Sequence, residues 1–223
     1  GTLLPMELEK FTNTYFGLLA KKAAPFGFQP EPLVAAVWKG TKAMVKNDGT
    51  ETNDKRFWDT FAGEMGEEVL QLRPVFDGFY ANEFHGAKAA CGENPLARRA
   101  IDGLKAKGYD VVLATNPIFP LVGVETRLSW VGLRPEDFSY ITAYENSTTC
   151  KPNPAYYAEI LRKTGKRPQE CLMVGNDATE DTAALEQGIG VYLVTDCLLN
   201  PKGRDISGVP QGTFAAFLEF AGV

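Results

Sequence analysis

Residues 171–181 read CLMVGNDATED, and this stretch decides the fold class. The apolar run 171–174 is short and continuous, which is typical of a strand buried in a parallel sheet. Asp177 and Asp181 follow it, four positions apart. Residues i and i+4 share one face of a helix, so a loop that runs into a helix here turns both carboxylates the same way. The stretch therefore predicts a strand and a helix with paired carboxylates between them.

The same alternation of strands and helices is predicted on both sides of this stretch. Apolar runs predict strands at 111–114, 138–142, 171–174 and 191–195. Helical spacing and capping residues predict helices at 94–108, 121–131, 153–163, 180–188 and 214–220. Strands that alternate with helices indicate an α/β fold with a Rossmann-like parallel sheet.

The first third of the chain has a different pattern. Leu8, Phe11 and Tyr15 begin a series of apolar residues at helical spacing, and no strand is expected before about residue 109. We interpret the aromatic side chains of this part as its own core: Trp38, Phe57, Trp58 and Phe61. The pattern changes near residues 85–95.

Polar side chains collect where the predicted strands end. Thr115 and Asn116 follow the first strand, Lys151 follows the second after a loop, and Asp177 and Asp181 follow the third. The carboxyl ends of parallel strands share one edge of a sheet, so these side chains can converge. Carboxylates suit Mg²⁺, and lysine offers a point charge to phosphate. The set predicts a site for magnesium-assisted phosphoryl transfer.

Composition and charge exclude several classes of protein. The 223 residues carry a formal net charge of −5, which argues against nucleic-acid partners and against docking on anionic lipid. No apolar stretch is long enough for a membrane span. The four cysteines are scattered and form no Cys-x-x-Cys pair, so we expect reduced thiols and a cytoplasmic location. A reactive thiol at Cys150, beside Lys151, is a minor alternative.

Four motifs in order resemble the haloacid dehalogenase (HAD) superfamily, in the subgroup with a helical C1-type cap. Residues 113–116, Leu-Ala-Thr-Asn, look like its second motif. Residues 151–154, Lys-Pro-Asn-Pro, look like its third, and residues 174–181 look like its acidic fourth motif. Residues 1–4, Gly-Thr-Leu-Leu, look like the tail of the first motif, Asp-x-Asp-Gly-Thr-Leu.

The resemblance implies a domain organisation. Residues 1–5 would start the core, residues 6–90 would form the helical cap, and residues 91–223 would complete the α/β core. The family's first Asp is a nucleophile that becomes aspartyl-phosphate, and its second Asp is an acid/base. This pair is missing before Gly1, and we expect it in a segment clipped from the front of the sequence.

The resemblance also implies a role for each site residue. Thr115 would donate a hydrogen bond to a phosphoryl oxygen, and Asn116 would line the pocket. Lys151 would neutralise charge on the nucleophile and the phosphoryl group. Asp177 would bind Mg²⁺, while Asp181 would either bind the ion through water or orient Lys151.

These implications combine into one expected function. The protein is expected to be a Mg²⁺-dependent phosphatase that hydrolyses a small phosphorylated metabolite through an aspartyl-phosphate intermediate, as a monomer or homodimer. Three alternatives stay open: a non-catalytic binding module if Gly1 is the true start, a phosphomutase, and a dehalogenase. The acidic pair favours a phosphatase over a dehalogenase.

Overall fold

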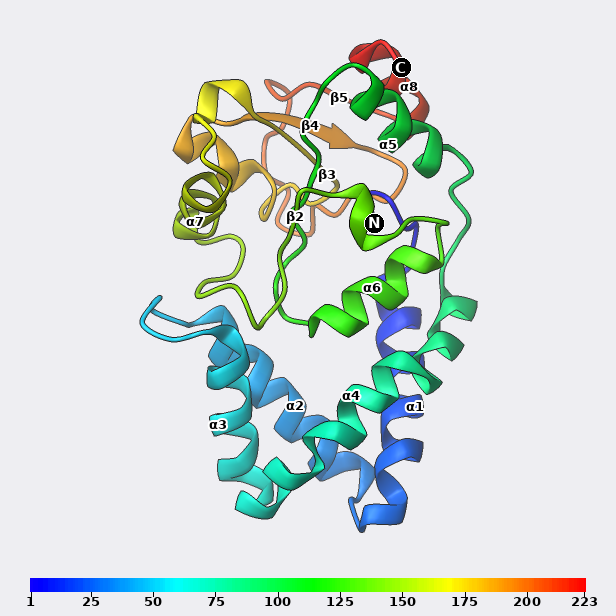
Figure 1. Ribbon diagram of the computed structural model, residues 1–223, viewed down its shortest axis with the longest axis vertical. Coiled ribbons are helices and arrows are strands. Elements are labelled where there is room, and N and C mark those ends of the chain that lie inside the picture. Colours follow the sequence, from blue (N-terminus) through cyan, green and yellow to red (C-terminus); the bar gives the residue numbers. More distant parts are fainter.

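The structure is a computed structural model that describes residues 1–223. A helical part and an α/β part lie at opposite ends of the molecule, and α6 lies between them (Figure 1). The predicted fold class, a Rossmann-like α/β core with a helical cap, is confirmed. None of the helices combines the length and the apolar composition that a membrane span requires.

The helical part, hereafter the cap, is built from helices that share one aromatic core. Its elements are α1 (Leu8–Ala23), η1 (Ala24–Phe26), α2 (Pro30–Val45), α3 (Asn53–Met65), η2 (Glu67–Leu72), α4 (Arg73–Ala81) and η3 (Glu83–Ala90). Phe61, Phe79 and Phe84 are among its most buried side chains. The Thr52 hydroxyl accepts a hydrogen bond from the Lys55 amide, which fixes where α3 begins.

The α/β part, hereafter the core, follows the predicted alternation. Its elements are α5 (Leu96–Ala106), β1 (Val112–Leu113), α6 (Leu121–Ser129), η4 (Pro135–Asp137), β2 (Tyr140–Ile141), α7 (Pro154–Thr164), η5 (Pro168–Glu170), β3 (Leu172–Gly175), η6 (Thr182–Gln187), β4 (Gly190–Val194), β5 (Gln211–Gly212) and α8 (Phe214–Ala221). Two details differ from the prediction. The short strand β5 was not expected, and the helix predicted over 180–188 is a 3₁₀ helix. Only six residues separate Asp181 from the left-handed turn at Gly188, which suits a short 3₁₀ segment.

All strand pairs are parallel, but they form two sheets. One sheet has the order β1-β2, with Val112 opposite Tyr140, and the other has the order β3-β4-β5, with Met173 opposite Val191. β1 and β3 therefore each have a strand partner on one side only. Leu3 packs against the hydrophobic clusters of both sheets, so the N-terminal segment runs between them.

The chain passes between core and cap at two adjacent places. The Gly92 amide donates a 2.7 Å hydrogen bond to the Pro5 carbonyl, and Met6 and Cys91 form an antiparallel bridge. A second connection is made by side chains, because Trp130, which follows α6, packs into the aromatic cluster of the cap. The cap is thus held by both backbone and side-chain contacts.

Candidate active site

Lys151 and Asp181 form the centre of the candidate site. The Lys151 Nζ donates to Asp181 Oδ1 at 2.7 Å, and each side chain is only 5% exposed. Lys151 lies before α7, and Asp181 lies between β3 and η6, directly before the first residue of η6. A buried ion pair of this kind places a cation in a site shielded from water, where its charge is screened little.

Asn116 joins the segments that follow β1 and β3. Its Nδ2 donates to Glu180 Oε1 at 2.8 Å, and its Oδ1 accepts from the Lys151 amide at 3.2 Å. The second, third and fourth motif segments are therefore linked by direct hydrogen bonds. The convergence of Asn116, Lys151 and the acidic segment, which the sequence only allowed, is present in the structure.

Thr115 is fixed through its backbone and free at its side chain. Its carbonyl accepts from Thr142 Oγ1 at 2.7 Å and from the Tyr156 hydroxyl at 2.8 Å. No hydrogen bond within the protein involves the Thr115 hydroxyl, and the side chain is partly exposed. The hydroxyl is therefore available to a ligand at the end of β1.

The two aspartates differ in their hydrogen bonding. Asp181 Oδ2 accepts from the amides of Asn176 and Asp177 at 2.8 and 2.9 Å, so both of its oxygens have protein donors. Asp177 Oδ1 accepts from the amides of Thr179 and Glu180, whereas its Oδ2 accepts no hydrogen bond. Of the two roles predicted for Asp181, the contacts match that of a partner that orients Lys151.

The carboxylate oxygens of the site determine which metal ion it can bind. No group of three His, Cys, Asp or Glu side chains is arranged to hold a metal ion. Mg²⁺ needs only one or two carboxylates when waters and substrate phosphate complete its coordination. The free Oδ2 of Asp177 fits such a site as one ligand.

Glu180 is a site residue that the sequence reasoning missed. Burial raises the pKa of its carboxyl to about 7, and Asp177 and Asp181 add to the rise while Lys151 and Asn116 oppose it. A carboxyl with a pKa near neutrality can exchange protons at working pH, which is common in catalytic sites. Its place inside the acidic stretch was visible in the sequence, but its burial was not.

Two further polar residues, Cys150 and His85, make contacts within the protein rather than facing a ligand site. Burial raises the pKa of the Cys150 thiol to about 12, which keeps the thiol protonated and argues against a reactive cysteine. His85, the only histidine, accepts a 3.2 Å hydrogen bond at Nδ1 from Trp130 Nε1. The His85 contact joins the cap to Trp130, and Cys150 Sγ accepts a 3.3 Å hydrogen bond from Asn53 Nδ2 of the cap.

The fold is an α/β core that carries a helical cap. A family model described as haloacid dehalogenase-like hydrolase matches residues 1–188. The chain belongs to this family, as the four motifs had indicated. A search of curated protein sequences finds no match.

Several solved structures share the fold. A predicted phosphoglycolate phosphatase from Haemophilus somnus 129pt is 17% identical, with a TM-score of 0.54, and the match covers 96% of this chain and 92% of that one. A candidate β-phosphoglucomutase from Thermotoga maritima is 18% identical, with a TM-score of 0.56 and coverage of 100% and 95%. An L-2-haloacid dehalogenase is 14% identical, with a TM-score of 0.55 and coverage of 98% and 94%. At these identities the likeness concerns the fold alone.

Proposed function

We propose that this hydrolase is a Mg²⁺-dependent phosphatase acting on a small phosphorylated metabolite. The observation that carries the proposal is the buried pair of Lys151 and Asp181, joined through Asn116 to the end of β1. A fixed cation beside carboxylates suits the transfer of a phosphoryl group, whose catalysis depends on positioning and charge neutralisation.

Each residue of the site would have its own role in the reaction. The Thr115 hydroxyl would donate a hydrogen bond to one phosphoryl oxygen, and the Lys151 ammonium would balance negative charge on another. Asp181 would hold Lys151 in place, as its 2.7 Å contact supports. Asp177 would offer its free Oδ2 to Mg²⁺, which when bound would neutralise charge on the phosphate.

The nucleophile belongs to the same proposal. β1 and β3 each have one edge without a strand partner, and Leu3 packs against the hydrophobic clusters of both sheets, so these two edges can accept a further strand. We propose that this strand precedes Gly1 and carries the Asp-x-Asp pair, of which the first Asp would form the aspartyl-phosphate. The end of that strand would reach the site beside Asn176, whose side chain accepts a hydrogen bond from Thr2 Oγ1 at 3.0 Å.

The test is phosphate release from p-nitrophenyl phosphate by the full-length protein, with Mg²⁺ and with EDTA. Lys151→Met removes the buried cation and should lower kcat by at least about a hundredfold. Lys166→Met, which removes a surface lysine paired with Asp110, is the matched control and should leave kcat unchanged. Equal turnover by the wild type and Lys151→Met, or full turnover in EDTA, would contradict the proposal.

The alternatives give different products in the same assay series. A dehalogenase would release halide from a 2-haloacid without metal, and a mutase would move phosphate within a sugar phosphate without releasing it. A binding module would release neither. The cytoplasmic location, the absence of nucleic-acid and membrane partners, and a monomeric or homodimeric state stay predictions.

A further inference from the structure

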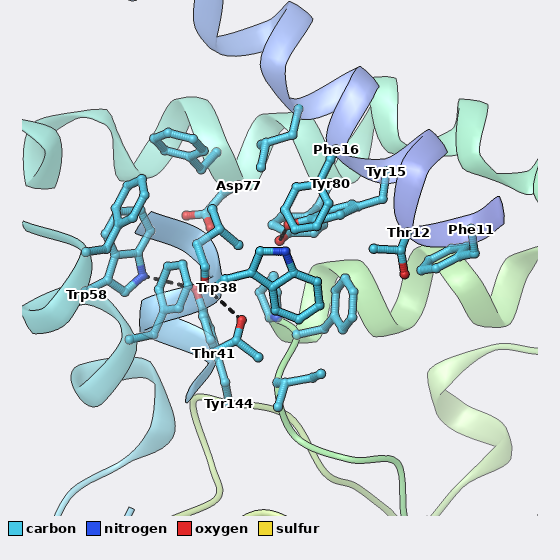
Figure 2. A pocket seen from close by; sticks show the side chains of 18 of the residues that line it. Phe11, Thr12, Tyr15, Phe16, Trp38, Thr41, Trp58, Asp77, Tyr80 and Tyr144 are labelled. Carbon is cyan, nitrogen blue, oxygen red and sulfur yellow. Dashed lines mark hydrogen bonds between the residues drawn. The ribbon is translucent and has the colours of Figure 1, made fainter. Parts of the chain in front are cut away.

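A cavity of about 150 Å³ lies at the junction of the cap and the core (Figure 2). Side chains from α1, α2, α3 and α4 form most of its wall, and the segment Ile118 to Pro120 and Tyr144 close it from the core. Ile118 is two residues beyond Asn116, and Ile118 and Tyr144 of the wall pack in one cluster with Cys150, the neighbour of Lys151.

Most polar atoms on the aromatic rings of the wall are paired, whereas Trp38 Nε1 and the Thr12 hydroxyl make no hydrogen bond within the protein. The hydroxyls of Tyr15 and Tyr80 are hydrogen-bonded to each other at 2.8 Å, and Trp58 Nε1 donates to the Tyr144 hydroxyl at 3.2 Å. Fifteen of the nineteen lining residues are hydrophobic. A sugar in this cavity would bury several hydroxyls against a wall with few free polar partners, which is costly, whereas an apolar ring has no polar groups of its own to desolvate.

Trp38 is one of the exposed residues of this wall, together with Leu8 and Asp77. The cap's aromatic residues were predicted to form its own core, and Trp58 and Phe61 do so, but Trp38 is 52% exposed. Its ring packs against Phe16, with centroids 5.5 Å apart, and faces the cavity (Figure 2). An exposed tryptophan over an apolar cavity is suited to cover a ligand.

Asp77 gives the cavity a charge preference. It is the only ionised side chain of the lining and has no ion-pair partner, because the neighbouring Arg73 pairs with Asp54. The residue is exposed, and desolvation raises the pKa of its carboxyl while the nearby Arg73 opposes the rise. A carboxylate at this position disfavours an anionic substituent on any ligand.

We propose that the cavity binds the leaving group of the substrate, and that this group is a single aromatic ring without an anionic substituent. The size supports this class, since an apolar cavity of about 150 Å³ accommodates a benzene-sized molecule. The substrate would be an aryl or arylalkyl phosphate whose phosphate extends toward Thr115 and Lys151. The inference rests on the proposed phosphatase function and adds the substrate class to it.

The first test compares kcat/KM for benzyl phosphate and glycerol phosphate. The wild type should prefer benzyl phosphate by about a hundredfold. Trp38→Ala should reduce this preference by about tenfold, and Trp38→Phe should restore most of it. Phe26→Ala removes a ring that is also exposed but lies outside the cavity, so it should leave the preference unchanged.

The second test concerns charge. The wild type should discriminate against 4-carboxybenzyl phosphate relative to benzyl phosphate, and Asp77→Asn should reduce that discrimination by about fivefold. An equal preference for glycerol phosphate, or a preference unaffected by Trp38→Ala, would overturn the inference.

A third measurement separates this inference from the proposed function. Benzyl alcohol carries the ring without the phosphate, and its binding can be followed by tryptophan fluorescence. Saturable binding that Trp38→Ala weakens, without hydrolysis of any phosphate ester, would support the ring site and contradict the phosphatase. Phosphate release without any benzyl alcohol binding would support the phosphatase and overturn the ring site.

Discussion

Lys151 and Asp181 depend on each other because both are buried. Asp181→Asn would place an amide donor against the Lys151 ammonium and leave that charge without a counter-ion. We expect the variant to lose about 3 kcal/mol of unfolding free energy, in the range seen when one member of a buried pair is removed. Urea unfolding followed by circular dichroism measures this loss. An unchanged midpoint would show that Lys151 has another partner.

Replacing Asp177 should affect activity rather than stability, in contrast to Asp181. An asparagine at 177 keeps one oxygen that can accept from the amides of Thr179 and Glu180, so Asp177→Asn should change stability by less than about 1 kcal/mol. It removes the free carboxylate charge, and Mg²⁺-dependent hydrolysis should fall sharply. Assays over a range of Mg²⁺ concentrations, paired with urea unfolding, test both halves. A stable variant with unchanged Mg²⁺ dependence would exclude Asp177 as a ligand.

Glu180 should make stability depend on pH. Its folded pKa of about 7 lies above the ordinary value of 4.5, so between these values the folded protein binds more protons than the unfolded chain. Stability therefore decreases as pH rises from 4.5 to 7, by about 2–3 kcal/mol from this group.

Glu180→Gln removes this titration and serves as the comparison. In buffer without divalent cations, the wild type should lose unfolding free energy as the pH rises from 4.5 to 7, and the variant should not lose this part. The variant should therefore become more stable relative to the wild type as the pH rises. Glu170→Gln, at an exposed carboxyl, should show no such relative gain. Parallel curves for Glu180→Gln and the wild type would mean that Glu180 is ionised throughout.

The start of α3 ties the cap to the loops of the site. Asn53 is fully buried, and its Nδ2 donates to the carbonyls of Pro117 and Thr149 at 3.2 and 3.3 Å. Asn53→Ala leaves both carbonyls without this donor, so we expect a loss of about 2 kcal/mol. Phosphatase activity should fall as well, because Pro117 follows Asn116.

Thr52→Ala is the matched control for that prediction. It removes the side-chain cap of the same helix at a partly exposed position and should cost about 1 kcal/mol without lowering activity. Thermal unfolding and turnover measured on both variants separate the helix's own stability from its contact with the site. Equal activity in both variants would contradict a positioning role for Asn53.

The cap and the core are expected to unfold together. Trp130 belongs to the core in sequence but packs into the cap's aromatic cluster, with its ring 5.2 Å from that of Phe84. The three tryptophans therefore report on the cap, whereas far-ultraviolet circular dichroism reports on both parts. The two probes should give coincident thermal transitions in the wild type.

Trp130→Ala should separate these transitions, since it removes a large side chain that joins the two parts. Phe217→Ala removes a buried ring of α8 within the core and should lower both transitions together. Separate transitions in the wild type would show that the cap is an independent folding unit.

The sequence by itself determined the order of the elements. The apolar run at 171–174 and the alternation around it correctly predicted β3, α7 and β4, because strand and helix periods are local properties of the chain. It also predicted that Thr115, Asn116, Lys151 and the aspartates would converge, and hydrogen bonds from Asn116 to Glu180 and from the Lys151 amide to Asn116 link three of these segments.

Only the tertiary structure decided how those residues are paired and buried. The hydrogen bonds of Asp181 to Lys151 and to its own loop, the burial that raises the pKa of Glu180, and the exposure of Trp38 all depend on contacts between distant segments. The cavity likewise needs four cap helices and a core loop to close around it. Spacing along a chain fixes which side chains can meet, but burial and partners follow from packing, which no local pattern encodes.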